Sequence, residues 1–452
     1  MTKEVHVDFA RSQQQLADVA ESLIARALAN GASDAVVSVS ESNGLSVELR
    51  QGRVKSRTRE IHSGISLTAF RGQRQGSTNS TDFSADSLEE MAQAACTIAS
   101  FTGEDPKAGQ AEAELLCREA AELDLNHPWA LDVDAAVTLA RRIEAGIAAE
   151  GAEAESDGSW VGANQSQFFL ATSRGFAKGF SQSNHSLAAS VLARRGEQRQ
   201  RNFWSSQERM ASRLQAPEAV GAEAAQRALA MLDIQPLATH SGPVLFDARS
   251  ACSLIGHFAS AASGRALYTR NSFLSDRLEQ SLFADHLDLR EDPFIIGGKA
   301  SAPFDGEGIA GQRRELISAG RLQGYFLGIY SARQLGMTST GNASGPHNLR
   351  LHSRLTQAQD DFDAMLRKLD TGLLVTGLAG DGVRMITGDY SRAANGFWVQ
   401  GGEIQHAVSG ITIASDLRSM WRAIVAVGND CFSQGALNSG SVLIDNMRIA
   451  GH

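Results

Sequence analysis

The feature of this sequence that most restricts its fold is a long stretch of alternating polar and apolar residues, from Ala154 to Arg209. Successive side chains of a β-strand point to opposite faces, so alternation predicts strands with one buried and one solvated face. The stretch is too long for one strand and contains several turn residues. We therefore expect several antiparallel strands here.

Helices with one apolar face precede and follow this stretch. Apolar residues recur at helical spacing in each of them, and Asn30-Gly31 supplies a stop for the first. Ser84 or Asp86 is the expected N-cap of the second. The expected helices are Leu16–Leu28, Ser87–Phe101, Val133–Glu150 and Pro217–Leu232.

Short alternating runs lie between the first two helices, and the sequence changes character again after Ser241. Ala35–Val39, Leu45–Leu49 and Gly64–Phe70 are expected to be strands, with a hairpin turn at Gln51-Gly52. Beyond Leu274, Gly-rich turns separate short strands, and Thr356–Lys368 is the one long helix expected there.

These patterns predict an α+β protein with an N-terminal helix and antiparallel-sheet region followed by a β-rich C-terminal domain. Thr102–Asn126 is charged and Ala-rich, as a connector would be. The expected domains are an N-terminal α+β unit at 1–105, a central α+β unit at 125–235 and the β-rich domain at 240–452.

Composition narrows the function classes. The chain has 452 residues and a formal net charge of −9, whereas a protein built to hold nucleic acid is usually basic. The N-terminus lacks the apolar segment of a signal peptide, and apolar runs such as Ala423–Val427 are too short to span a bilayer. We expect a cytoplasmic protein with no membrane partner.

The four cysteines, Cys96, Cys117, Cys252 and Cys431, lie far apart and form no C-x-x-C motif. Buried free thiols in a reducing compartment are the favoured interpretation.

One glycine motif resembles a dinucleotide-binding turn. The stretch FDGEGIAG, Phe304–Gly311, contains G-x-G-x-x-G. A dinucleotide turn needs a buried strand before it and a helix after it, so that the helix N-terminus faces the pyrophosphate. Pro303 and Asp305 argue against such a strand, and the residues after Gly311 predict two strands around a turn instead. The nucleotide interpretation is therefore rejected.

Other local motifs for catalysis are absent from the sequence. The glycine-rich turn at Gly377–Gly382 and the GGKA stretch at Gly297–Ala300 lack the Lys-Ser/Thr ending of a P-loop. No H-E-x-x-H or G-x-S-x-G occurs, although a triad assembled by the fold stays open. His347 and His352 are five residues apart, and structural or surface roles are favoured for the histidines.

A basic stretch allows two interpretations. Arg194, Arg195, Arg199 and Arg201 precede Phe203 and Trp204, as in a groove that stacks nucleic-acid bases. The alternative is a strand face that points to solvent. The net negative charge of the chain favours this alternative.

The densest polar and aromatic cluster lies in Thr387–Ile404. Asp389, Tyr390, Ser391 and Arg392 come just before Phe397 and Trp398, between glycines. Loops at strand ends present functional groups from a rigid sheet, so a site is one interpretation. A structural Asp–Arg clamp that holds the turn is the other.

Longer segments resemble a known family. APFDGEGIAGQRRELISAGRLQGYFLGIYSARQLGMTSTGNA (Ala302–Ala343), TGLAGDGVRMITGDYSRAANGFWVQGGEIQHAVSGITIASDL and VGNDC are similar to the C-terminal domain of the PmbA/TldE group of TldD/PmbA proteins. Chain length and domain order agree. The resemblance implies an α+β N-terminal region, a β-rich C-terminal domain and a cytoplasmic heterodimer with a TldD-type zinc metallopeptidase subunit. Such complexes degrade unfolded peptides and process peptide precursors, and the older family label is modulator of DNA gyrase.

The resemblance also identifies a degenerate zinc motif. TldD-type members carry H-E-x-x-x-H on a helix, and Cys252-Ser253-Leu254-Ile255-Gly256-His257 occupies that position here. Cys252 replaces the first ligand, Ser253 replaces the general-base Glu, and His257 alone is retained. Metal-bound water needs several ligands and a base to attack a peptide carbonyl, so catalytic residues and metal ligands are expected to be absent from this chain. Zinc is expected in the partner.

The sequence therefore favours a non-catalytic partner subunit that shapes a peptide groove. A peptide added as a β-strand is bound mainly through its main chain, which gives low sequence selectivity. Two alternatives stay open: an active hydrolase with an unconventional site, and a gyrase- or DNA-associated binding module. A homodimer in the absence of the partner also stays open. The expected groove or interface contacts are Asp305, Glu307, Asn342, Asp389, Ser391, Arg392 and Trp398.

Overall fold

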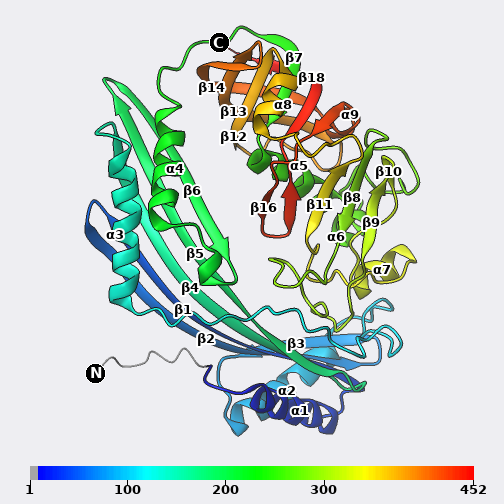
Figure 1. Ribbon diagram of the computed structural model, residues 1–452. Coiled ribbons are helices and arrows are strands. Elements are labelled where there is room, and N and C mark those ends of the chain that lie inside the picture. The colour runs from blue at the N-terminus through cyan, green and yellow to red at the C-terminus, as the bar shows by residue number, and fades with distance from the viewer. Residues whose placement is uncertain (1–8, 452) are drawn as a thin grey trace. The chain divides into compact units, whose positions relative to one another are not determined.

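The computed structural model describes residues 9–451 and divides into two compact units (Figure 1). Unit 1 comprises Met1–Leu232 together with Pro303–Ala310, and unit 2 comprises Asp233–Ala302 together with Gly311–His452. Both units combine helices with sheets, which confirms the predicted α+β class.

Unit 1 contains six strands and four α-helices among its described residues. The strands are β1 (Asp34–Arg50), β2 (Arg53–Arg71), β3 (Arg74–Ser80), β4 (Ala154–Thr172), β5 (Ala177–Arg195) and β6 (Gln198–Glu208). The helices are α1 (Gln13–Ala29), α2 (Ala85–Phe101), α3 (Val133–Ala149) and α4 (Pro217–Leu229), with a short 3₁₀ turn at Ala211–Arg213.

The strands of unit 1 form one antiparallel sheet in the order β3-β2-β1-β4-β5-β6. The two short runs expected at Ala35–Val39 and Leu45–Leu49 are parts of the single strand β1, because alternation continues between them. The hairpin turn at Gln51-Gly52 is confirmed, and both residues have positive φ, 52° and 73°. Strands from the first and second predicted domains therefore share one sheet.

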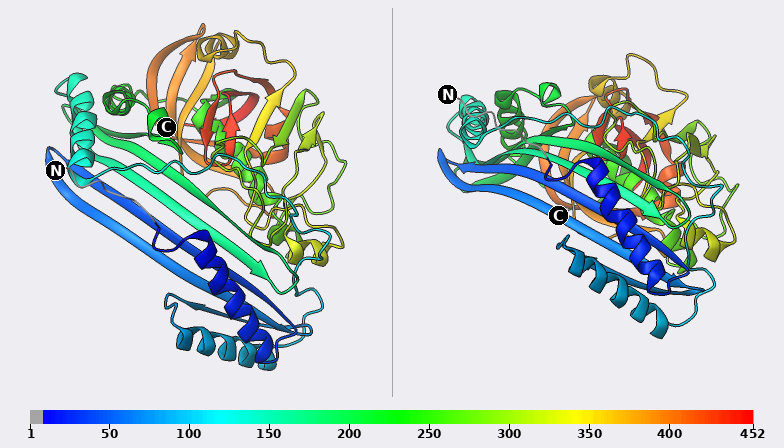
Figure 2. Two further views of the ribbon diagram at one scale, coloured as in Figure 1. Left: turned by 60° about the horizontal axis from the view of Figure 1, so that its bottom comes forward. Right: turned by 90° about the horizontal axis from the view of Figure 1, so that it is seen from below.

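The helices of unit 1 cover one face of this sheet at its two ends. α1 and α2 pack on Val37 and Val39 of β1, whereas α3 and α4 pack over Leu45 and Val47 of the same strand. Figure 2 shows α1 lying along the sheet, and α3 at the other end of the long strands. The helix starts follow the expected caps: Ser84 caps α2, and Pro217 opens α4.

Pro303–Ala310, which contains most of the glycine motif, belongs to unit 1. Phe304 packs edge-on against Phe176 and Phe180, with ring centroids 5.1 and 5.4 Å apart. The Cys117 N–H donates to the Gly308 carbonyl at 2.8 Å. Gly308 has φ +82°, and a Cβ there would lie 3.1 Å from the Phe176 ring, so glycine is needed for both reasons. As expected, no strand runs directly into the motif and no helix follows it directly, and two strands around a turn, Arg314–Ser318 and Arg321–Leu322, come after it.

Unit 2 contains the remaining elements. Its helices are α5 (Ala248–Ala261), α6 (Gly264–Tyr268), α7 (Ile329–Leu335), α8 (Phe362–Leu369) and α9 (Leu417–Arg422). Its strands are β7 (His240–Phe246), β8 (Leu287–Glu291), β9 (Arg314–Ser318), β10 (Arg321–Leu322), β11 (Leu349–Ser353), β12 (Gly372–Ala379), β13 (Asp389–Gln400), β14 (Glu403–Asp416), β15 (Ile424–Val427), β16 (Phe432–Gln434), β17 (Leu437–Ser439) and β18 (Val442–Ala450).

These strands form two six-stranded sheets. One has the order β10-β9-β8-β11-β17-β16, and the other has the order β14-β13-β12-β7-β18-β15. β14 also pairs with β18, which closes the second sheet into a ring. α5 follows β7 and buries Leu254, Ile255 and Phe258 in the largest apolar core of the chain.

Some sequence expectations are corrected. The helix predicted at Thr356–Lys368 begins only at Phe362, because the Asp361 side chain accepts the Ala364 N–H and caps the helix there. Cys96, Cys117 and Cys252 are buried free thiols as expected, whereas Cys431 is exposed. Within residues 9–451, no helix is long and apolar enough to cross a membrane.

Candidate functional site

The degenerate zinc motif lies on α5. This helix begins where the Asp247 carboxylate accepts the Ser250 N–H at 2.7 Å, directly after the buried strand β7. Cys252 and His257 are five residues apart, and both are held on a helix that is anchored in the core of unit 2.

Cys252 is fully buried. Its Sγ lies 3.6 Å from the Phe432 carbonyl oxygen and 3.8 Å from the Leu437 carbonyl oxygen, at β16 and β17. Burial raises the pKa of this thiol to about 11, so it stays protonated at neutral pH and can donate to these carbonyls. A metal ligand must be a thiolate, and this environment opposes that form.

Ser253 is the residue that the resemblance places at the general-base position of the zinc motif. Its hydroxyl donates to the Ser250 carbonyl at 2.7 Å, a local helix contact. A hydroxyl does not ionise near neutral pH, so Ser253 does not replace the carboxylate.

His257 is half-buried and packs edge-on against Tyr390, with ring centroids 5.8 Å apart. Burial, together with the nearby Arg392 charge, lowers the pKa of His257 to about 4. The imidazole is therefore neutral at pH 7. Its Nε2 is buried and has no hydrogen-bond partner among the described residues.

Tyr390 and Arg392 follow each other on one face of β13. Tyr390 is 1% exposed, its hydroxyl has no partner within residues 9–451, and burial raises its pKa. The half-buried Arg392 has an Nε without a partner there and forms no ion pair with Asp389. We call His257, Tyr390 and Arg392 the α5–β13 cluster, in which three polar side chains lack partners.

The other residues predicted on β13 point elsewhere. Asp389 and Ser391 are exposed on the opposite face of the strand, because side chains alternate. The Thr387 hydroxyl donates to Asp389 at 2.7 Å, so threonine rather than Arg392 holds this carboxylate. Trp398 packs edge-on against His240 at 5.3 Å.

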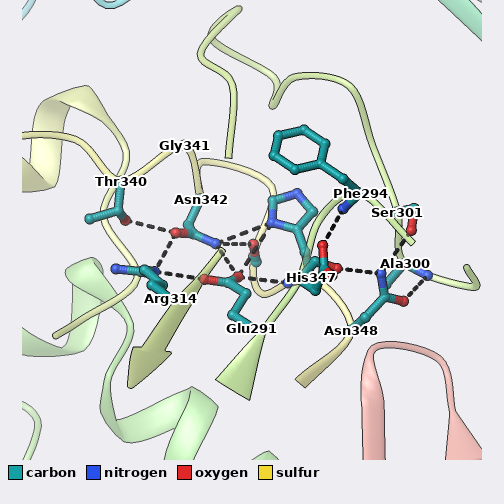
Figure 3. A network of polar contacts seen from close by, with 12 residues as sticks. Glu291, Phe294, Ala300, Ser301, Arg314, Thr340, Gly341, Asn342, His347 and Asn348 are labelled. Atoms are coloured by element: carbon teal, nitrogen blue, oxygen red, sulfur yellow. Dashed lines mark hydrogen bonds and ion pairs between the residues drawn. The ribbon is translucent and has the colours of Figure 1, made fainter. Parts of the chain in front are cut away.

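Asn342 belongs to a buried polar network centred on Glu291, shown in Figure 3. Glu291, which is 2% exposed, accepts from the Asn342 side chain at 2.7 Å and from the His347 N–H at 2.8 Å. Arg314 forms an ion pair with it at 2.8 Å. Arg314 also donates to the side-chain amide oxygen Oδ1 of Asn342, as does the Thr340 hydroxyl.

The charge of Glu291 is stabilised within this network. Burial alone would raise the pKa of this carboxyl, but the hydrogen bonds from His347 and the Arg314 charge outweigh burial and lower it. Sequence reasoning missed Glu291 and Arg314. The available signal was a charged residue at the end of a short strand of alternating apolar and charged residues, and this pattern also fits a surface position.

Asp305 and Glu307 lie in unit 1. Asp305 is 2% exposed, and one carboxylate oxygen accepts from the Glu307 N–H at 2.9 Å and from the Ile309 N–H at 3.0 Å. These are the contacts of a side chain that holds a turn.

The residues of the motif do not fit zinc. Structural and catalytic zinc sites use at least three protein ligands that converge on the metal. In the described part of the chain, no three His, Cys, Asp or Glu side chains gather in that way. Cys252 is held as a thiol by two carbonyls, and Ser253 supplies no base.

The basic stretch of β5 and β6 is largely neutralised. Arg194 and Arg201 pair with acidic residues of β4 at 3.1 and 2.9 Å, and Arg195 pairs at 2.6 Å with the residue just before β4. In the same order, the partners are Glu155, Asp157 and Glu153. This pairing supports the interpretation of a solvated strand face.

Known proteins resemble this chain over almost its full length. Family models of the PmbA/TldA metallopeptidase match residues 35–99 (domain 1), 126–232 (central domain) and 239–451 (C-terminal domain). Metalloprotease PmbA of Escherichia coli O157:H7 is 41% identical over 426 residues, 94% of each chain. A PmbA homolog of Haemophilus influenzae is 35% identical over 97% of each chain.

A solved structure has the same fold. TldE from Thermococcus kodakarensis superposes with a TM-score of 0.82 at 17% identity, over 96% of this chain and 100% of that one.

Proposed function

Because the chain belongs to the PmbA/TldD metallopeptidase family and is of the PmbA type, we propose that it is the non-catalytic subunit of a zinc metallopeptidase heterodimer. A TldD-type subunit would hold the zinc, and the complex would act on unfolded peptides and peptide precursors in the cytoplasm. The observation that carries this proposal is the environment of Cys252 and Ser253, which suits neither a zinc ligand nor a general base.

The α5–β13 cluster is the part of this chain that we expect to touch the peptide. Arg392 is half-buried and forms no ion pair within residues 9–451, and a buried charge is costly unless it is paired. A peptide carbonyl or carboxylate would accept from the half-buried Arg392, and neutral His257 can donate or accept. Asp389, Ser391 and Trp398 would then contact neighbouring parts of the peptide or the partner.

The proposal gives a supporting role to three other predicted residues, Asn342, Asp305 and Glu307. The hydrogen bonds of Asn342 are used within the Glu291 network, and those of Asp305 hold its turn. We expect them to support the shape of the surface, with peptide contact a secondary role.

Metal analysis of the two subunits tests the proposal. This chain is co-expressed with a TldD-type subunit, the complex is purified, and zinc is measured in the complex and in each separated subunit. We expect zinc in stoichiometric amount with the partner and a trace with this chain. Cys252→Ala should leave the zinc content and peptide cleavage of the complex unchanged, as should Cys431→Ala as a control. Stoichiometric zinc in this chain that is lost in Cys252→Ala would overturn the proposal.

A further inference from the structure

The sheet of unit 1 has an edge that is paired along only part of its length. β2 pairs with β1 from Arg53 to Phe70, whereas β3 pairs with β2 only from Ile65 to Arg71. Arg53–Gly64 is therefore an edge strand, which we call the β2 edge.

The backbone of the β2 edge is available for pairing. In a strand, alternate N–H and C=O groups point to each side, and those of Arg53–Gly64 that point away from β1 have no partner among the described residues. All twelve of its residues, Arg53 to Gly64, are exposed or half-buried, and Ile61 is 64% exposed. Such an edge is a template for another strand.

The charges of the β2 edge have one sign. Arg53, Lys55, Arg57 and Arg59 are all exposed, and none forms an ion pair within residues 9–451. Glu60 is the single acidic residue of the stretch, and it lies 3.4 Å from His62. The chain as a whole carries a net charge of −9, so the charge of the β2 edge is opposite in sign to that of the whole chain.

These charges select among strands that could add to the edge. Basic residues on an edge strand oppose pairing with a second copy of the same edge, because like charges would face each other. The same residues attract an acidic strand and increase its rate of association. The β2 edge is therefore built against self-pairing and suited to an acidic partner.

A groove marks where the added strand would meet β3. It has a volume of about 550 Å³, and it is lined by Gly64 of β2 and by Ser80 and Thr81 at the end of β3. Ser38, Ser40 and Ser66 supply further hydroxyls to its wall. A strand on the β2 edge continues the position that β3 occupies, so its end would enter this groove.

We propose that the β2 edge, Arg53–Gly64, binds an acidic, extended segment of another protein as an added β-strand. Main-chain hydrogen bonds supply the pairing, and the four basic side chains select acidic residues on the added strand. The proposal concerns unit 1 alone and does not depend on the zinc content of either subunit.

Peptide binding to the full chain tests the proposal. The probe is a fluorescein-labelled, ten-residue peptide of alternating glutamate and valine, and the control is its lysine–valine counterpart. Fluorescence anisotropy should give a Kd at least tenfold lower for the acidic peptide, rising with salt because the attraction is screened. Hydrogen–deuterium exchange should then show new protection in Arg53–Gly64 and none in β6, the other edge of the same sheet.

Variants with matched charge complete the test. Arg57→Glu with Arg59→Glu should weaken binding of the acidic peptide at least tenfold. Arg118→Glu with Arg141→Glu changes the net charge equally at exposed positions of unit 1 and should change the Kd less than twofold. Circular dichroism checks that both variants fold.

Three results would overturn the proposal. One is equal binding of the acidic and basic peptides, which would mean that the basic residues of the β2 edge only prevent self-pairing. Another is binding without protection of Arg53–Gly64. The third is protection that rises with protein concentration in the absence of peptide, since a second copy would then be the partner.

Discussion

Two groups of buried polar side chains in unit 2 differ in whether their hydrogen bonds are made. In the Glu291 network, the carboxylate, an arginine, an asparagine and a histidine satisfy one another. In the α5–β13 cluster, His257, Tyr390 and Arg392 each keep a polar atom without a partner in the described structure. The first arrangement stabilises loops, whereas the second leaves hydrogen-bonding capacity for a ligand.

The difference has an energetic basis. A satisfied buried ion pair is costly to break, because removal of one partner leaves the other charge buried and uncompensated. An unsatisfied polar atom already carries its desolvation cost, so its removal costs little. Substitutions in the two groups should therefore have opposite consequences for stability and for binding.

The largest effect is expected at Glu291. Glu291→Ala should lower the free energy of unfolding by about 3–5 kcal/mol, because Arg314, Asn342 and His347 lose their common acceptor. Glu291→Gln keeps an acceptor oxygen and should cost less. Urea unfolding followed by circular dichroism measures both, and a loss under about 1 kcal/mol for the alanine variant would contradict this role of Glu291.

The next effect is a pH dependence at His257. The folded pKa is about 4, below the ordinary value of 6.5, so the unfolded chain binds a proton that the folded chain does not. This contribution to stability is complete above pH 6.5 and is lost as the pH falls toward 4, by about 3 kcal/mol at most.

His257→Gln should therefore lose less stability than the wild type between pH 7 and pH 4.5, measured by urea unfolding at each pH. His62→Gln, at an exposed position, is the control and should follow the wild type. Parallel pH profiles for wild type and His257→Gln would show that the histidine is solvated.

A pair of tyrosines separates satisfied from unsatisfied hydroxyls directly. Tyr325 is 4% exposed and its hydroxyl donates to the Leu274 carbonyl at 2.7 Å, whereas the Tyr390 hydroxyl has no partner in residues 9–451. Tyr325→Phe should cost about 1–2 kcal/mol, and Tyr390→Phe should change the unfolding free energy by less than about 0.5 kcal/mol. Equal costs in thermal or urea unfolding would remove the distinction between the two groups.

Arg392 is expected to affect binding more than stability. Arg392→Met removes a half-buried charge without a counter-charge, so the unfolding free energy should stay within about 1 kcal/mol of the wild type or rise. Binding of an unfolded peptide by the proposed heterodimer should weaken about tenfold, since a charged hydrogen bond contributes about 1.5 kcal/mol or more. Arg392→Lys, which keeps the charge, should bind better than the methionine variant.

Sequence patterns predicted most of the fold where a pattern was long. Alternation over β4 and β5 and the helical spacing in α1 to α4 fixed the type of each element, with ends near those observed. The start of the helix predicted at Thr356–Lys368 was wrong, because Asp361 caps the helix and it begins only at Phe362. The union of strands from two predicted domains in one sheet depends on the pairing of β1 with β4, which no local pattern encodes.

The candidate site was predictable in part. The resemblance placed the degenerate zinc motif on the residues of α5, which stays a prediction, and α5 and β13 bring His257 and Tyr390 into contact. The burial of Glu291 was not predicted, because it depends on partners that are distant in the sequence. The role of Asp305 in holding its turn was not predicted either. Asn342 was predicted as a groove or interface contact, which stays a prediction, and its partners in the Glu291 network were not foreseen.

The assignment of Pro303–Ala310 to unit 1 has a consequence for the order of events during synthesis. Phe304 fills a space against Phe176 and Phe180, and the Gly308 carbonyl accepts the Cys117 N–H. A nascent chain that has emerged only as far as Leu232 lacks these partners. Although domains generally fold from the N-terminus as they leave the ribosome, unit 1 must wait for much of unit 2 to be translated before its packing is complete.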